Sequence, residues 1–503
     1  MTKLTRRQFL AGLGTTIAAA SFVDARRLTD PAIAPVQARP AQLHHVYVAK
    51  NGTPVTNVQE VVELAGGIER FIGVDDVVVL KPNGQWPRQG YTHTECMKAL
   101  IDVILARPGG FGGEVIVAEH VQRKESDTLS GNYCWNMPAG SNRNNNWPDM
   151  NYMELMDDYH DRGIHNVTAI PLINVGQADI SDNWEAVSGP ADLSPGKHGW
   201  VRLPAYTAAN GRSITPSYPI LRSAYSGKLI DLHRGGGVWE NGGYNSQQVR
   251  FIPLPTLNNH GWGSEDYAGI TSAVKCHIGF QEGTSLHYVG YGYNRPDAVG
   301  ESVGYLITTV LVPTFYLTCA EYSGHVSRTG GATHTRTVGL CADPVTLDYW
   351  MCKYVLYPCN EVSYFNPDND NNTRQTLLGC HGEGVGTLNE AEMDVQIVDV
   401  SQLATVALRG APADGAIHLS WQVTGPLPGG LTWEIAHTSS AGEVDPAVSG
   451  LVAETRAHTL DGLSNGVVYT VTLRGKVDDE VVMSDTATVM ATDKFVYLPL
   501  VQR

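Results

Sequence analysis

The sequence predicts a mixed α/β protein, with a mostly parallel sheet, flanking helices and a long loop-rich insertion, followed by a C-terminal β-sandwich. Short apolar runs alternate with helical apolar spacing between residues 44 and 120. Asn, Gly and Pro dominate residues 121–245. Short strands with turn residues between them recur at regular spacing over residues 404–492. A chain of 503 residues is also long enough for two or three domains.

The α/β domain is expected over residues 44–400. It begins with a strand at 44–50, and the apolar runs at 75–83 and 113–120 are typical of strands buried on both faces. Helical spacing falls between these runs, at 55–68 and 94–107. Strand, helix, strand, helix, strand is the order that produces a parallel sheet with right-handed crossovers.

The segment from 121 to 245 interrupts this pattern. It contains one expected helix, at 151–163, and one expected strand, at 166–173, and the remainder is predicted to be long ordered loops. Long loops on a rigid scaffold often cover a binding cleft. A surface insertion without ligand contacts is the equally good alternative.

The N-terminus carries an export signal, predicted at residues 1–25, with a linker at 26–43. A basic start precedes a short apolar run and small residues, and "TRRQFL", Thr5–Leu10, resembles the twin-arginine signal. An ordinary secretory signal with two chance arginines is the alternative. The apolar run is too short for a stable membrane span. We therefore expect an extracytoplasmic, secreted or cell-surface protein. Twin-arginine substrates typically cross folded, which favours a bound metal ion or cofactor.

The net charge and the spacing of the cysteines argue against a nucleic-acid-binding protein and against two kinds of metal site. The formal net charge is −16 and no basic stripe is present, so a nucleic-acid partner is not expected. None of the eight cysteines forms a CxxC pair, so neither a zinc ribbon nor an iron–sulfur cluster is supported. An even count and an oxidising destination leave disulfides open, although their pairing cannot be deduced.

Polar side chains follow several of the expected strands. Because ligands bind beyond the carboxyl ends of strands in open α/β sheets, these side chains are expected to meet at one edge. The candidates at this edge are Lys81, Asn83, Glu119, His120, His260 and Asp343.

Each candidate has a chemical role and a structural alternative. Lys81 and Lys275 are expected to bind an anionic substrate, or to act as bases if burial lowers their pKa. His260 and His277 are candidate metal ligands or acid–base groups, or structural histidines. Asp343 either orients a catalytic group or caps the helix that follows it. The expected catalytic residues are Lys81, His260, Lys275 and Asp343, with Asn83 and His277 binding a cofactor and His260 and His277 binding a metal.

The same segments resemble the family called domain of unknown function 362. The resemblance rests on "VVLKPNGQW" with Lys81 and Asn83, on residues 252–279, on "TVGLCADPVTLDYW" and on residues 377–398. It covers roughly residues 44–400 and implies a fold and a site location rather than a reaction. Asn258 and Asn259 stand where the family has Lys-Thr, and Cys276 stands where it has Asn. The ferredoxin-like cluster domain of many relatives has no counterpart in these cysteines.

The C-terminal segment resembles a fibronectin type III domain. Trp421 and "LDGLSNGVVYTVTLRG" carry the resemblance, which implies that Leu463 is a core residue and Tyr469 a corner residue. Such a domain is expected to be a spacer, or an attachment module for a cell surface or a carbohydrate. Residues 493–503 form a tail.

Two functions remain open from the sequence. The first is an exported enzyme, redox or isomerase-like, with a metal- or cofactor-binding polar cleft and an unknown small-molecule ligand. The second is a non-catalytic secreted or cell-surface protein that binds a carbohydrate or a small anion. Aromatic side chains suit sugar stacking, and the candidates are Trp135, Trp147, Trp184, Trp200 and Trp239.

Overall fold

The computed structural model describes most of the chain after residue 42. The described ranges are 43–84, 90–120, 133–136, 150–172, 179–181, 193–207, 213–233, 235–260, 269–281, 296–324, 332–359, 361–402, 404–425, 427, 430–440, 442–477 and 480–494. All of these residues belong to one unit, Leu43–Arg503. The signal expected at 1–25 and the linker up to residue 42 lie outside the described residues, as does most of the tail.

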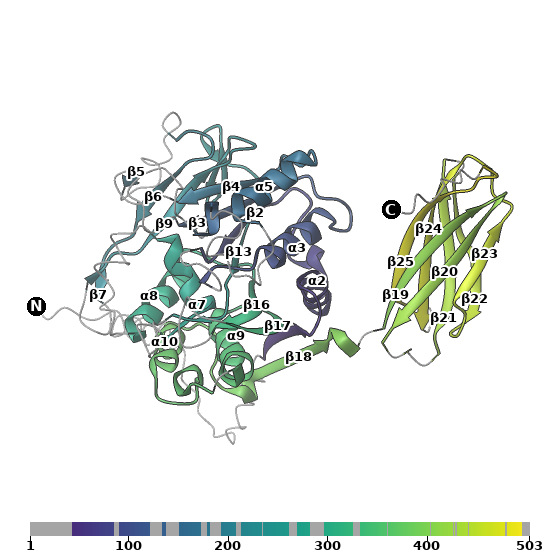
Figure 1. Ribbon diagram of the computed structural model, residues 1–503. Coiled ribbons are helices and arrows are strands. Elements are labelled where there is room, and N and C mark those ends of the chain that lie inside the picture. Colours follow the sequence, from purple (N-terminus) through teal and green to yellow (C-terminus); the bar gives the residue numbers. More distant parts are fainter. Residues whose placement is uncertain are drawn as a thin grey trace, which may run out of the picture. The chain divides into compact units, whose positions relative to one another are not determined.

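A parallel four-stranded sheet forms the centre of the α/β domain. Its strand order is β13-β2-β3-β4, and every neighbouring pair is parallel. The strands are β2 (Val77–Pro82), β3 (Glu114–His120), β4 (Val167–Leu172) and β13 (Val249–Leu254). A parallel sheet with flanking helices is what the alternating apolar runs predicted, so the α/β class is confirmed at this level (Figure 1).

Helices cover one face of this sheet because their apolar stripes match its alternate residues. They are α2 (Pro54–Leu64), α3 (Thr94–Leu105) and α5 (Tyr152–Asp161). Val78 and Leu80 of β2 share a core with Val61 of α2 and Leu100 of α3. Thr53 and Asn151 begin α2 and α5 with capping boxes, which satisfy amides that the first helical turn leaves unpaired.

A second sheet covers the opposite face. Val77 and Val79 of β2 share a core with Trp200 and Ile220 of this six-stranded sheet, whose order is β12-β11-β10-β9-β6-β5. All its neighbours are antiparallel except β5 and β6. The strands are β5 (Asp179–Ser181), β6 (His198–Arg202), β9 (Ser217–Arg222), β10 (Leu229–Asp231), β11 (Gly237–Glu240) and β12 (Gly243–Tyr244).

The region from 121 to 245 is therefore richer in strands than expected. Its strands are only two to six residues long and are broken by Gly and Pro, so they leave little periodic signal in the sequence. The shortest pair is β7 (Tyr206–Thr207) with β8 (Ser213–Ile214), and the segment also contains α4 (Tyr133–Asn136). Burial against the parallel sheet stabilises strands that local sequence does not identify.

The first strand lies in a different sheet from the one expected. β1 (His44–Lys50) pairs antiparallel with β17 (Ala332–Cys341) and parallel with β18 (Met393–Asp399), in the order β16-β17-β1-β18. β16 spans Tyr316–Gly324. Two backbone bonds join this sheet to the parallel sheet, from Thr314 N to Phe251 O at 2.7 Å and from Cys319 N to Pro255 O at 2.8 Å. The domain therefore contains both parallel and antiparallel strand pairs rather than mostly parallel ones, because β1 pairs with strands that lie far from it in the sequence.

Short elements after β13 complete the domain. β14 (Asn258–Asn259) pairs with β15 (Ile270–Thr271), and α7 (Ala273–Cys276) continues into a 3₁₀ turn at His277–Phe280. The longer helices are α8 (Pro296–Thr309), α9 (Pro344–Met351) and α10 (Asn372–His381). Among the residues described, no helix is long and apolar enough to span a membrane.

Residues 405–490 form two antiparallel sheets around one core. The sheets have the orders β19-β20-β23 and β22-β21-β24-β25. Trp421 of the first and Trp433 of the second pack edge to face, with ring centroids 5.8 Å apart. Tyr469 Oη accepts a hydrogen bond from Ser464 N at 2.9 Å. The strands are β19 (Thr405–Ala413), β20 (Ala416–Thr424), β21 (Thr432–Ser439), β22 (Gly442–Val452), β23 (Ala457–Asp461), β24 (Val468–Val477) and β25 (Glu480–Met490).

Candidate functional site

A buried ion pair lies at the carboxyl ends of β2 and β3. Lys81 Nζ is 2.5 Å from Glu119 Oε2, and both side chains are 1% exposed. Lys81 Nζ also donates to Pro82 O at 2.8 Å. The register pairs Leu80 with Val117, so the polar residues that end the two parallel strands lie at the same edge of the sheet. This is the edge at which open α/β sheets bind ligands.

Burial controls the ionisation of this pair. It raises the pKa of Glu119 to about 7, and the attraction of Lys81 offsets only part of that shift. Burial alone would lower the pKa of Lys81, but Cys276 and Glu119 outweigh it and the pKa is raised. Glu119 is therefore a carboxyl group that exchanges a proton near neutral pH, beside a lysine that remains charged. That is the protonation behaviour a general base requires.

Two glycines leave the space that the pair occupies. A Cβ atom on Gly279 would lie 2.6 Å from Glu119 Oε1 and 2.8 Å from Lys81 Nζ. A Cβ on Gly84 would lie 2.4 Å from Cys134 Sγ and 2.6 Å from Glu119 Cγ. Both loops thus approach the charged pair more closely than any side chain would permit.

Cys276 lines the same cluster. Its thiol donates to Lys81 O at 3.4 Å, and burial raises its pKa to about 12. Cys276 is therefore a neutral thiol that packs as a small buried residue. Burial also raises the pKa of Cys134.

Hydrogen bonds to neighbouring segments fix the position of Asn83. Its N–H donates to Thr92 Oγ1 at 2.9 Å, and its Oδ1 accepts from Thr256 N at 3.0 Å. Tyr152 Oη donates to Asn83 O at 2.9 Å. Asn83 thus connects the loop after β2 to the loop after β13, and it positions the edge on which Lys81 lies.

His277 is a buried, neutral histidine next to the ion pair. Its Nε2 is 2.7 Å from Tyr316 Oη, and its ring packs edge-on against Phe251 and Tyr316. Burial, and then the charge of Lys81, lower the pKa of His277 to about 3. Its Nδ1 has no hydrogen-bond partner in the described part of the chain.

Two amide side chains on the segments that follow β13 are also unsatisfied. Gln281, which ends the turn after α7, is 2% exposed, and Asn258 of β14 is 1% exposed. Neither the oxygen nor the nitrogen of either amide meets a partner among the residues with described positions. Buried polar groups are almost always hydrogen-bonded in native proteins, so unsatisfied atoms such as these are candidates for contact with a polar ligand or water.

Lys275 and His260 lie on the segment that runs from β14 through α7. Lys275 is half-buried on α7, between the buried Val274 and Cys276. His260 is half-buried, with Nδ1 3.1 Å from Thr271 Oγ1. The start of α7 is held by Asp348, which accepts from Ser272 Oγ at 2.6 Å. Burial raises the pKa of Asp348 to about 7.

Asp343 follows a strand of the mixed sheet rather than of the parallel sheet. It caps α9, with Oδ1 accepting from Thr346 N at 2.8 Å. Its Oδ2 lies 2.9 Å from His44 Nδ1. The structural alternative predicted for Asp343, a helix cap, is the role that this geometry supports.

The described residues do not fit a metal centre. No group of three or more His, Cys, Asp or Glu side chains suited to a metal ion occurs within the described ranges. His260 pairs with Thr271 and His277 with Tyr316. A metal bound by His260 and His277 stays a prediction, and no chemical step is derived through it.

Sequence reasoning missed several residues at this edge. The sequence marked Glu119 as a candidate without a stated role, and it gave no indication of Tyr316, Gln281 or Cys134. Position at a strand end was the available signal for Glu119. Tyr316 carries no such signal, because it begins a strand of the other sheet and reaches His277 only through tertiary packing. His120, the other candidate without a stated role, is buried, with its ring centroid 6.0 Å from that of Trp200.

Two of the five tryptophans expected to stack on sugars lie in the hydrophobic core. Trp135 and Trp200 are 0% exposed, in the cores on the two faces of the parallel sheet. Trp239 is half-buried and packs edge-on against Tyr244 at 5.0 Å. Trp147 and Trp184 lie outside the described residues. The buried pair is unavailable for stacking on a ligand.

All eight cysteines fall within the described ranges, and all are free thiols. Seven are buried, and Cys359 is partly exposed. The disulfides that the even count left open are therefore not formed in this structure.

Comparisons with known proteins add little. No family model matches the chain, and no curated protein matches it. A solved structure, described as the crystal structure of FMN-binding beta-glucuronidase from Facaelibacterium prausnitzii L2-6, aligns at 14% identity with a TM-score of 0.15. The alignment covers 33% of this chain and 24% of that chain. A TM-score this low carries no argument about fold or function.

Proposed function

We propose that the α/β domain is an enzyme that transfers a proton on a small polar substrate, in an isomerase-like or redox reaction, at the carboxyl edge of the parallel sheet. The observation that carries the proposal is the buried Lys81–Glu119 pair, in which burial raises the pKa of Glu119 to about 7. Perturbed carboxyl groups of this kind concentrate at functional sites, because acid–base catalysis needs a pKa near the working pH.

The neighbouring side chains supply the other parts of such a site. Glu119 accepts the proton, and the Lys81 ammonium stabilises the negative charge that develops on the substrate. His277 Nδ1 and the amides of Gln281 and Asn258 are buried and unpartnered among the described residues, so they offer hydrogen bonds that orient a ligand. The substrate must bring both donors and acceptors to satisfy them.

A proton-transfer enzyme exchanges substrate hydrogen with solvent, which gives a test that needs no known substrate. The protein is incubated in deuterated water with a small-molecule extract, and compounds that gain deuterium are identified by mass spectrometry. We expect at least one labelled compound with the wild-type protein. Glu119→Gln should reduce labelling by at least about 100-fold, the usual contribution of a general base.

Glu63→Gln is the matched control, because Glu63 is an exposed glutamate of α2. It should leave the labelling unchanged. Equal labelling by the wild type and a folded Glu119→Gln variant, or no labelling by either, would refute the proposal. Elemental analysis and an absorption spectrum of protein exported through its own signal test the separate prediction of a metal or cofactor, with His260→Ala and His277→Ala as the variants.

The organisation of the chain is also a proposal. "TRRQFL" supports export by the twin-arginine pathway, and the motifs around Lys81, Lys275 and Asp343 support membership in the domain of unknown function 362 family. The three-plus-four strand order and the Tyr469–Ser464 bond support a fibronectin type III-like domain that acts as a spacer or attachment module.

A further inference from the structure

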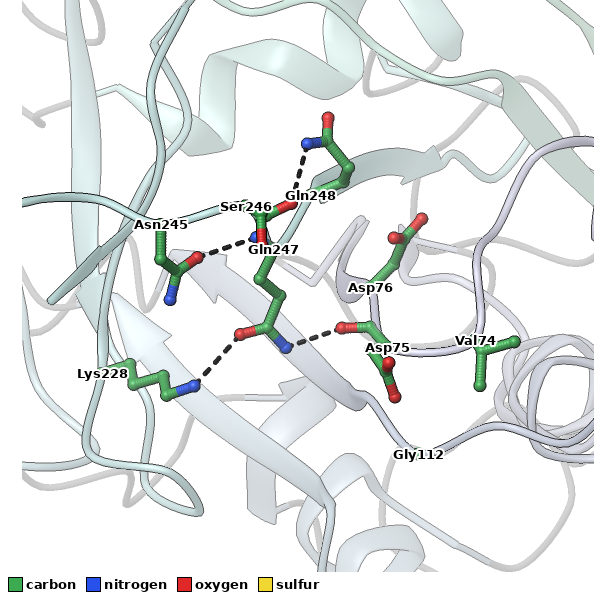
Figure 2. Close-up of a pocket in the computed structure, with 9 residues that line it drawn as sticks. All are labelled: Val74, Asp75, Asp76, Gly112, Lys228, Asn245, Ser246, Gln247 and Gln248. Carbon is green, nitrogen blue, oxygen red and sulfur yellow. Dashed lines mark hydrogen bonds between the residues drawn. The ribbon is translucent and has the colours of Figure 1, made fainter.

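A polar groove lies at the other edge of the parallel sheet, at the amino ends of β2, β3 and β13. Its volume is about 580 Å³, within the range of roughly 300–1,000 Å³ that small-ligand sites occupy. Four segments line it, namely residues 74–76, 112, 228 and 245–248 (Figure 2). Lys81 and Glu119 are at the carboxyl ends of the same strands, so the groove is separate from the site proposed above.

Hydrogen bonds hold the wall of this groove in place. Gln247 Nε2 donates to Asp75 O at 2.6 Å, and Gln247 Oε1 accepts from Lys228 Nζ at 3.3 Å. The Gln247 N–H donates to Asn245 Oδ1 at 2.8 Å. Figure 2 shows the Gln247 amide bridging Lys228 and Asp75. A side chain fixed at both ends is preorganised, which reduces the entropic cost of binding a ligand.

Charge and backbone bonding argue against an anion. Asp75 and Asp76 both line the groove. Three backbone N–H groups at this edge already donate to carbonyl groups of the protein. Gly112 and Gly113 donate to Val74 O at 2.8 and 3.1 Å, and Val77 donates to Gln248 O at 2.9 Å.

A metal cation also fits poorly. Asp76 is engaged by Arg250 Nε at 2.6 Å and by Gly73 N at 2.8 Å. That leaves the Asp75 carboxylate, whereas Ca²⁺ requires about 6–8 oxygen ligands. An apolar ligand fits no better, because Val74 is the single hydrophobic side chain among the lining residues.

We propose that this groove binds a neutral polyhydroxyl ligand, a short saccharide. The Asp75 carboxylate is exposed and can accept bonds from two neighbouring hydroxyl groups. Lys228 and the exposed amide of Gln248 supply donors and an acceptor within the same lining. Mixed donors and acceptors with nearly balanced charge match hydroxyl groups, each of which both donates and accepts. The proposal does not depend on the proton-transfer function.

Saturation-transfer NMR of the full-length protein with maltose and cellobiose tests the proposal. We expect at least one of these neutral disaccharides to bind, with a Kd of roughly 1 mM or tighter. Asp75→Ala and Gln247→Leu should each weaken binding about tenfold, because a hydrogen bond to a charged or preorganised group is lost. Gln422→Leu, at an exposed glutamine of β20, is the matched control and should bind as the wild type does.

Three outcomes would overturn the proposal. The first is that neither disaccharide binds the wild-type protein. The second is that a disaccharide binds equally well to the wild type and to folded Asp75→Ala and Gln247→Leu variants. The third is that inorganic phosphate or Ca²⁺ displaces the disaccharide at equal concentration, which would make the groove an ion site. Asp75 is exposed, so Asp75→Ala is expected to unfold at the wild-type temperature and to report on binding alone.

Discussion

The ammonium group of Lys81 lies 2.5 Å from the carboxylate of Glu119, although each side chain is only 1% exposed. Removing two charges from water costs several kcal/mol per ion, and the mutual attraction recovers that cost only with good geometry. Neighbouring parallel strands supply the geometry, and Gly279 supplies the space. An arrangement that costs folding energy at this edge supports the proton-transfer function proposed for it.

Removing one charge of this pair should destabilise the protein strongly. Lys81→Met or Glu119→Leu alone leaves a buried, unpaired charge, and each should cost about 3–5 kcal/mol in the free energy of unfolding. The double variant Lys81→Met/Glu119→Leu leaves no charge and should cost much less than the sum. Urea unfolding of the four proteins measures this coupling. Additive costs would show that the two side chains do not interact.

The pH dependence of stability should report the pKa of Glu119. Burial raises it from 4.5 to about 7, so the folded state holds the proton more tightly than the unfolded state does. The resulting stabilisation is complete below about pH 4.5 and is lost as pH rises to 7. The wild type should therefore lose about 3 kcal/mol relative to Glu119→Gln over this interval.

Comparison with the Glu119→Gln variant is essential, because other buried groups also titrate. Burial raises the pKa of Asp348 to about 7, which acts in the same direction. Burial lowers the pKa of His277 to about 3, so His277 stabilises the fold above pH 6.5 and that contribution is lost as pH falls. Both groups are present in the two proteins and cancel in the difference. A difference that does not vary with pH would contradict the shift in Glu119.

Gly279→Ala should disrupt the ion pair sterically. The added methyl group would lie 2.6 Å from Glu119 Oε1 and 2.8 Å from Lys81 Nζ, so one of the charged side chains must move. We expect a loss of about 1–3 kcal/mol in unfolding free energy, together with a change in the Glu119 titration. Gly243→Ala is the control, because nothing lies within 4 Å of a Cβ at that position. Equal stability of the two variants would argue against tight packing at Gly279.

Asp343→Ala should affect stability and not proton transfer. The variant loses the cap on Thr346 N and the contact with His44, and we expect a cost of about 1–2 kcal/mol. Asp343→Ser retains a capping oxygen and should recover part of this loss. Deuterium labelling by Asp343→Ala at the wild-type rate would confirm a structural role. A loss of labelling in the folded variant would restore the catalytic role predicted from sequence.

Thiol titration checks the state of the cysteines. All eight thiols should react with a disulfide reagent once the protein is unfolded without reductant. In the native protein Cys359 should react first, because it is partly exposed, whereas Cys134 and Cys276 are buried and burial raises the pKa of both thiols. Fewer than eight reactive thiols after unfolding would show that a disulfide forms in the cell.

Local pattern predicted the parts of this protein that depend on short-range physics. Continuous apolar runs identified β2 and β3, because strands buried on both faces need apolar residues throughout. The polar residues that interrupt those runs, Lys81 and Glu119, marked the edge of the sheet. Asp343 before Pro344 indicated the start of a helix, because capping chemistry is local.

The local sequence pattern could not predict which strands pair with each other over long distances in the chain. β1 has the apolar pattern of a strand but joins β17 and β18, nearly 300 residues or more along the chain, and no local feature selects these partners. The six-stranded sheet was missed for a related reason. Its strands are short, and they gain stability from packing on the parallel sheet rather than from their own propensity.

The sequence by itself determined the strands β1 to β4 and the helices α2, α3 and α5, and it placed Lys81, Asn83 and Glu119 at strand ends. Only the tertiary structure decided that Glu119 is the partner of Lys81, that Tyr316 reaches His277, and that Asp343 belongs to another sheet. The physical reason is that ionisation and pairing depend on burial and on neighbours. Both are properties of the assembled core, and residues distant in the chain create them.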